Sequence, residues 1–96
     1  MTYNSMEVLA RFLHKANKNT FANPLAKKVA STRLNSQDYH FEDGNFIYHD
    51  TYFGSRDFIG EEIVYQDQKP FWGMNYFGFI LADDVTDKEL GAFLEK

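Results

Sequence analysis

Cysteine is absent from the 96-residue chain, and proline occurs only twice. Without cysteine there is no disulfide framework, no thiolate metal site and no cysteine nucleophile. No apolar run approaches the roughly 20 residues that a membrane span requires. The first residues also lack the basic-then-apolar pattern of a signal peptide. These absences predict a cytoplasmic protein with no membrane partner.

Basic residues are also scarce, with 10 Lys and Arg against 14 Asp and Glu, and the formal net charge is −4. Because sequence-independent affinity for nucleic acids requires clustered Lys and Arg, direct nucleic-acid binding is not expected. Aromatic residues, in contrast, make up 18% of the chain. Large rings must therefore build much of the core of one domain, which is expected to span residues 1–96.

Hydrophobic periodicity divides the chain into a helical part and a strand-like part. Residues 4–17 predict an amphipathic helix that Asn4 caps. Its apolar stripe at helical spacing consists of Met6, Leu9, Phe12, Leu13 and Ala16. Residues 19–37 show no clear period and are expected to form a loop, with a turn at Asn23-Pro24.

From Asp38 the period is two, which indicates strands. Three turn signals separate four predicted strands, and they lie at Asp43-Gly44, 54–57 and 67–70. The three strands after the first are expected over 46–53, 58–66 and 71–81. A capping box at Thr86 and Glu89 opens a last helix. The predicted fold class is α+β: a four-stranded antiparallel curved meander flanked by an N-terminal and a C-terminal helix.

Loop length decides which residues of neighbouring strands face each other. The predicted turns place Asp50 opposite Glu61, and Glu61 opposite Tyr76, on one aromatic face of the sheet. The other face then carries a second polar set, formed by His49, Glu62 and Asn75. A shift of one residue in the middle hairpin would place Asp50 opposite Glu62 instead, and this alternative stays open.

Opposed carboxylates in apolar surroundings share a proton, bind a cation or accept hydrogen bonds from a ligand. Tyrosine and tryptophan rings around them describe a pocket for a cationic or amine-bearing small molecule. The predicted ligand-binding residues are Asp50, Tyr52, Glu61, Trp72 and Tyr76. The alternative interpretation is structural, with rings that only pack a core and carboxylates that are exposed or satisfied by Arg33, Arg56 or a backbone amide.

The second polar set allows acid–base chemistry, with the His49 imidazole held by the Glu62 carboxylate. His40 is expected to lie too far from Glu62 to share that site. No HExxH or comparable spacing is present, so no metal and no cofactor are predicted. A structural or surface role is the other interpretation of His49, and no catalytic residue is assigned.

Three segments carry a family resemblance: FLHKANKNTFA at 12–22, STRLNSQDYHF at 31–41 and YHDTYFGSRDFIGEEIVYQDQKPFWGMNYFG at 48–78. They resemble FLxxAxxxTYA, SRxxSxDYxY and YxDTYxGxxxFxGEExVxxxxxPVWxMNYxG of an uncharacterised bacterial domain family, with departures at Phe21, Leu34 and Phe71. Its members are small stand-alone proteins or are fused behind an XRE-type helix-turn-helix. The resemblance implies a cytoplasmic bacterial protein with a link to sensing or transcription regulation, and it implies no reaction.

Three functional hypotheses follow. The first is a non-enzymatic small-molecule-binding or sensor-like domain with an aromatic and acidic pocket on the central sheet. The second is a small enzyme that uses a His/Asp/Glu cluster for acid–base or divalent-metal chemistry. The third is a protein-interaction module, because two helices cannot cover both aromatic faces of the sheet and a homodimer would bury the second one.

Overall fold

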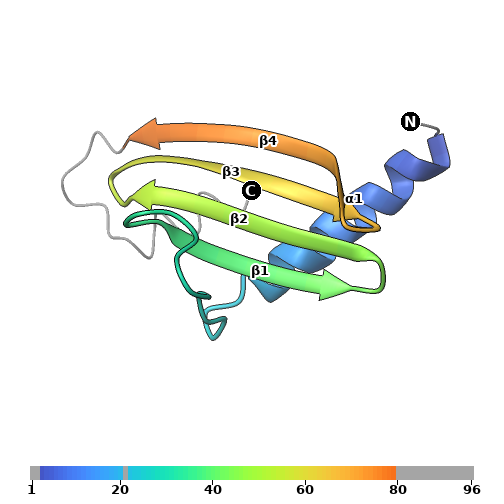
Figure 1. The fold of residues 1–96 in the computed structure, drawn as a ribbon, viewed down its shortest axis with the longest axis horizontal. Helices are drawn as coiled ribbons and strands as arrows, with labels where there is room; N and C mark the ends of the chain where they lie inside the picture. The colour runs from blue at the N-terminus through green and yellow to red at the C-terminus, as the bar shows by residue number, and fades with distance from the viewer. Residues whose placement is uncertain (1–2, 21, 80–96) are drawn as a thin grey trace.

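The computed structural model describes residues 3–20 and 22–79. Helix α1 (Tyr3–Asn19) is followed by four antiparallel strands, β1 (Gln37–Asp43), β2 (Phe46–Gly54), β3 (Asp57–Gln66) and β4 (Lys69–Phe79). The strands pair in the order β1-β2-β3-β4, and α1 crosses one face of this sheet (Figure 1). We call that face the helix face and the opposite one the outer face. The predicted N-terminal helix and antiparallel sheet are confirmed, whereas the predicted C-terminal helix lies outside the described residues.

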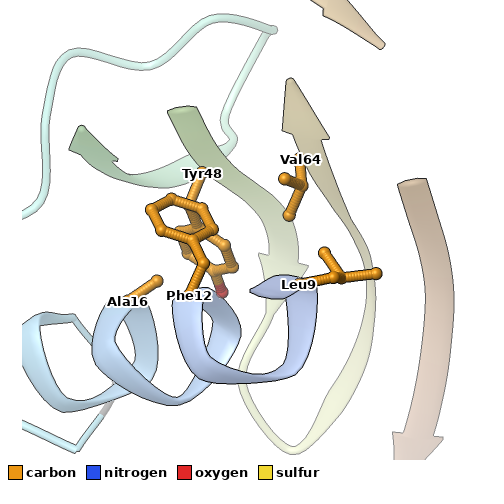
Figure 2. Close-up of a cluster of buried hydrophobic side chains, with 5 residues drawn as sticks. All are labelled: Leu9, Phe12, Ala16, Tyr48 and Val64. Atoms are coloured by element: carbon orange, nitrogen blue, oxygen red, sulfur yellow. The ribbon is translucent and has the colours of Figure 1, made fainter. Parts of the chain in front are cut away.

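The helix packs through the apolar stripe that its sequence predicts. Leu9, Phe12 and Ala16 recur at intervals of three and four residues, face the sheet and are buried. With Tyr48 of β2 and Val64 of β3 they form the core, as Figure 2 shows. In the described part of the chain, no helix is long and apolar enough to cross a bilayer.

Aromatic rings extend this core toward the β1–β2 turn. Phe12 stacks on Phe41 and Phe46, with ring centroids 6.0 and 5.1 Å apart. Phe46 in turn contacts Phe71 of β4 at 6.3 Å. Met6, at the other end of the predicted stripe, is 55% exposed and lies outside the core. Large rings thus carry much of the packing, as the aromatic composition predicts.

Two hairpin turns are shorter than the sequence predicts, and the third lies one residue later. The β2–β3 turn has three residues rather than four, because Gly54 pairs with Phe58. The β3–β4 turn needs only Asp67 and Gln68, which both adopt positive φ angles of 53° and 66°. Neither residue type signals such a turn as asparagine or glycine would, so the sequence predicted a four-residue loop. The β1–β2 turn consists of Gly44, with φ at 62°, and Asn45, one position later than expected.

The β2–β3 and β3–β4 turns, together with a β-bulge between Val64 and Tyr65, change the strand register on both sides of β3. Asp50 pairs with Glu62 rather than with Glu61, which is the alternative that the sequence left open. Glu61 pairs with Asn75 rather than with Tyr76. Because side chains alternate between faces, two successive shifts of one residue turn over β3 alone. Strands β1, β2 and β4 present the predicted side chains to each face, and β3 presents the opposite ones.

The segment between α1 and β1 forms the predicted loop. Val29 makes an isolated bridge with Asp38, and its amide nitrogen donates to the Asp38 carbonyl at 2.9 Å. This bridge fastens the loop beside the first strand. Thr32 and Ser36 are then close enough to bond the Asp38 side chain, which belongs to the outer face.

The core assignment predicts a large stability difference between two identical substitutions. Phe12→Ala removes a buried ring and should lower the free energy of unfolding by about 3–5 kcal/mol. Phe77→Ala removes a ring that is 81% exposed and should change it by less than about 0.5 kcal/mol. Urea denaturation followed by circular dichroism measures both values, and equal losses would contradict the assignment.

Candidate functional site

The predicted ligand-binding residues do not share one face of the sheet. Asp50, Tyr52, Trp72 and Tyr76 lie on the helix face, whereas Glu61 lies on the outer face. The predicted pairing of Asp50 with Glu61 is therefore wrong. Its physical reason is the turned-over β3, which exchanges the positions of neighbouring residues on that strand.

The exchange also changes the second polar set. His49 and Asn75 lie on the outer face as predicted, and Glu61 takes the place expected for Glu62. Glu62 instead lies on the helix face beside Asp50. The predicted contact between His49 and Glu62 is wrong, because the two side chains are on opposite sides of the sheet.

On the helix face, two tyrosines bond two carboxyl groups. The Tyr76 hydroxyl donates to Asp50 Oδ1 at 2.7 Å, and the Tyr48 hydroxyl donates to Glu62 Oε2 at 2.9 Å. We call these four residues the helix-face cluster. Asp50 and Tyr48 are fully buried, and Glu62 is 9% exposed. Within the described part of the chain, Asp50 Oδ2 has no hydrogen-bond partner.

Burial governs ionisation in the helix-face cluster. It raises the pKa of Asp50 to about 8, against the opposing hydrogen bond from Tyr76, and the charges of Glu62 and Asp38 raise it further. Burial also raises the pKa of Glu62, although the hydrogen bond from Tyr48 opposes it. Asp50 is therefore protonated near neutral pH, which avoids two adjacent carboxylate charges on neighbouring strands.

On the outer face, four side chains form a continuous hydrogen-bond chain. His49 Nε2 lies 2.6 Å from Asp38 Oδ2, and His49 Nδ1 lies 3.0 Å from His40 Nδ1. His40 Nε2 lies 2.8 Å from Glu42 Oε2. We call these residues the histidine chain. The β1–β2 register produces it by pairing His40 directly with His49.

Hydrogen-bond chemistry restricts where protons can lie in the histidine chain. Each nitrogen that faces a carboxylate must carry a proton, since an ionised carboxylate only accepts. The contact between the two Nδ1 atoms needs one further proton, on either ring. In that contact one ring donates and the other accepts.

Asp38 is the buried end of the histidine chain. It is fully buried, and it accepts hydrogen bonds from Thr32 Oγ1 at 2.6 Å, Ser36 Oγ at 2.5 Å and Thr51 Oγ1 at 2.7 Å. Burial opposes ionisation, but these bonds and the one from His49 hold the pKa of Asp38 well below its usual range. Asp38 is therefore a fixed negative charge behind the two imidazoles.

An open cleft of about 530 Å³ lies on the outer face and reaches the histidine chain. Ile47, Ile63 and Tyr65 supply its apolar surface, and its polar lining includes His40, His49, Arg33 and Glu61. This volume falls in the range of about 300–1,000 Å³ that small-molecule sites occupy. Among the described residues, no group of three or more His, Asp or Glu side chains could hold a metal ion.

Sequence reasoning missed the partners of His49. Asp38 and His40 were read as parts of a strand, and Thr32 and Ser36 as parts of a polar loop. A signal was available, because a turn at Gly44 and the following asparagine places His40 opposite His49 by counting alone. No local pattern, in contrast, indicates that the loop hydroxyls would converge on Asp38.

Comparison with known proteins gives one family match. Residues 50–96 match the model of a family described as a domain of unknown function (DUF5680). The match supports an uncharacterised domain family for this part of the chain. It includes Asp50, Glu61 and Glu62 and leaves His40 and His49 outside. No curated protein and no solved structure matches the chain.

The raised pKa of Asp50 predicts a pH-dependent stability. Its value in the folded protein, about 8, exceeds its ordinary value of 3.8, so the folded state binds the extra proton. The stabilisation is complete below about pH 4 and is lost as the pH rises toward about 8. Relative to Asp50→Asn, the wild type should lose stability across this interval in urea denaturation. Asp57→Asn, at an exposed carboxylate, is the control, and parallel profiles for wild type and Asp50→Asn would contradict the prediction.

The two ends of the histidine chain should differ in their effect on stability. Asp38→Asn leaves several buried donors without a full set of acceptors and should lower the free energy of unfolding by about 3 kcal/mol. Glu42→Gln changes a side chain that is 60% exposed and should cost less than about 1 kcal/mol. Chemical denaturation at pH 7 compares them, and similar losses would show that Asp38 does not organise the chain.

Proposed function

We propose that this chain is a non-enzymatic small-molecule-binding domain whose ligand occupies the outer-face cleft. The observation that carries the proposal is the cleft itself, which combines a ligand-sized volume with an apolar floor and a few polar side chains. Ile47 and Ile63 offer the floor, and Arg33 and Glu61 offer charged groups. The sheet behind the floor is braced by α1, so the cleft needs little rearrangement to accept a ligand.

The bonding of the helix-face cluster supports the choice of the outer face. There the Tyr76 and Tyr48 hydroxyls are already bonded to Asp50 and Glu62. Tyr48, Asp50 and Glu62 are buried, and Tyr76 is half-buried. Of the ligand-binding residues predicted from sequence, Glu61 alone lines the outer-face cleft. Ligand contacts by Asp50, Tyr52, Trp72 and Tyr76 stay a prediction from sequence.

A sensor role is the form of this function that we favour. The resemblance to bacterial domains fused behind XRE-type helix-turn-helix segments supports it, since such fusions couple a binding module to transcription. In this proposal, ligand binding to the domain is the signal to which a partner or a fused regulator responds. The matched family, a domain of unknown function, is compatible with the proposal and assigns no reaction.

The histidine chain favours acid–base catalysis as a second candidate function. Both imidazoles line the cleft, and Glu42, which covers His40 Nε2, is 60% exposed. A ligand that displaced Glu42 would meet a protonated nitrogen backed by a buried carboxylate, which is the arrangement of a general acid. A bound compound recovered chemically changed after incubation would favour this candidate over simple binding.

Blocking the cleft should abolish binding while leaving the fold intact. A metabolite library screened by thermal shift should contain compounds that raise the melting temperature of the wild type. Ile47→Trp fills the floor of the cleft and should remove that shift, whereas Met74→Trp, on the helix face, should retain it. Equal shifts for both variants would place the ligand elsewhere. Circular dichroism checks that both variants are folded.

A further inference from the structure

Two opposite charges line the cleft without pairing to each other. Arg33 comes from the loop before β1, and Glu61 comes from β3. Both also border a smaller groove of about 250 Å³ that continues from the cleft. In the part of the chain that the structure describes, neither side chain takes part in an ion pair. The two charges therefore border one connected space.

The guanidinium of Arg33 is positioned so that its donors stay available. It lies over the Phe53 ring, with its central carbon 5.4 Å from the ring centroid. A cation–π contact uses the face of the guanidinium and leaves its N–H groups at the edge. That edge has the fork geometry that binds a carboxylate through two parallel hydrogen bonds.

The carboxylate of Glu61 is available as well. Its cross-strand neighbours are Thr51 and Asn75. The Thr51 hydroxyl donates to Asp38 and not to Glu61. Among the described residues, no donor is bonded to the Glu61 carboxylate. Glu61 is half-buried, so a positively charged group beside it would be only partly screened by water.

The histidine chain does not act as a second cationic anchor. His40 and His49 lie between the carboxyl groups of Asp38 and Glu42, and all four ring nitrogens already have hydrogen-bond partners. Arg33 is thus the cation available for an anionic ligand group at this cleft, and Glu61 is the anion available for a cationic one. The apolar side chains of Ile47 and Ile63 line the same cleft, farther from Phe53 and Arg33 along the outer face than Glu61 is.

We infer that the cleft binds a zwitterion, namely an amino acid with an apolar side chain. Its carboxylate lies on Arg33, its ammonium group on Glu61, and its side chain on the Ile47 and Ile63 floor. A ligand with one charge would leave the other protein charge partly desolvated and without a partner, which weakens its binding. This inference rests on the proposed small-molecule-binding function and names its ligand class.

The test compares three molecules that share one side chain. L-Phenylalanine carries both charges, 3-phenylpropanoate lacks the amine, and 2-phenylethylamine lacks the carboxylate. Isothermal titration calorimetry with the full chain should give an affinity for phenylalanine at least about ten-fold above either analogue. L-Leucine, with 4-methylpentanoate and 3-methylbutylamine, repeats the comparison for an aliphatic side chain.

Two substitutions assign each charge of the ligand to its residue. Glu61→Gln should reduce the preference for phenylalanine over 3-phenylpropanoate to less than about three-fold. Arg33→Gln should do the same for phenylalanine over 2-phenylethylamine. Glu7→Gln and Arg11→Gln make the same changes at an exposed pair on α1 and should leave both preferences intact. Loss of preference in these controls would contradict the assignment.

The outcomes separate this inference from the function on which it rests. In one outcome, neither amino acid binds, but the screen finds an uncharged or singly charged compound whose binding Ile47→Trp abolishes. This outcome would overturn the zwitterionic ligand class and leave the proposed binding function of the cleft intact. Binding of phenylalanine that Ile47→Trp leaves unchanged would overturn both. Glu61→Gln and Arg33→Gln are checked by urea denaturation, and Arg33→Lys, which keeps the charge and loses the fork, should show an intermediate affinity.

Discussion

The packing of α1 onto Tyr48 and Val64 decides what the two faces of the sheet can do. Leu9, Phe12 and Ala16 cover one face and close its centre to water. The other face keeps a hollow above Ile47 and its neighbours, because no described helix covers it. A single amphipathic helix thus divides a four-stranded sheet into a core side and a side that is open to small molecules.

The same division explains why two aspartates on adjacent strands ionise so differently. Asp50 faces the core with one tyrosine donor, and burial raises its pKa to about 8. Asp38 is buried as well, but three hydroxyls and His49 donate to it, and its pKa is lowered. The additional donors at Asp38 and the neighbouring charge of Glu62 at Asp50 both contribute to this difference in pKa. The neutral carboxyl of Asp50 lies in the core, and the ionised carboxylate of Asp38 is part of the histidine chain beside the cleft.

The cleft combines features that are costly unless something binds there. Arg33 and Glu61 line one connected space without pairing to each other, and Ile47 and Ile63 expose apolar surface in the same cleft. Stability alone would favour a direct ion pair or an apolar cover at such a place. The histidine chain, by comparison, is satisfied within itself, so it shapes and polarises the wall of the cleft. These properties support the proposed binding function.

Local patterns in the sequence determined the helix, the number of strands and their antiparallel order. The Leu9, Phe12 and Ala16 spacing and the alternation after Asp38 depend only on neighbouring residues, and both are visible without the fold. Register was beyond such reading, because no residue type announces that the β2–β3 turn has three residues, with Gly54 paired to Phe58, or that Asp67 and Gln68 form a tight turn. One residue of register exchanged Glu61 and Glu62 between faces, since the side-chain period of a strand is two. The tertiary structure alone decided that Thr32 and Ser36 reach Asp38 and that Arg33 shares a cleft with Glu61, because these contacts join segments whose meeting depends on how the whole sheet packs.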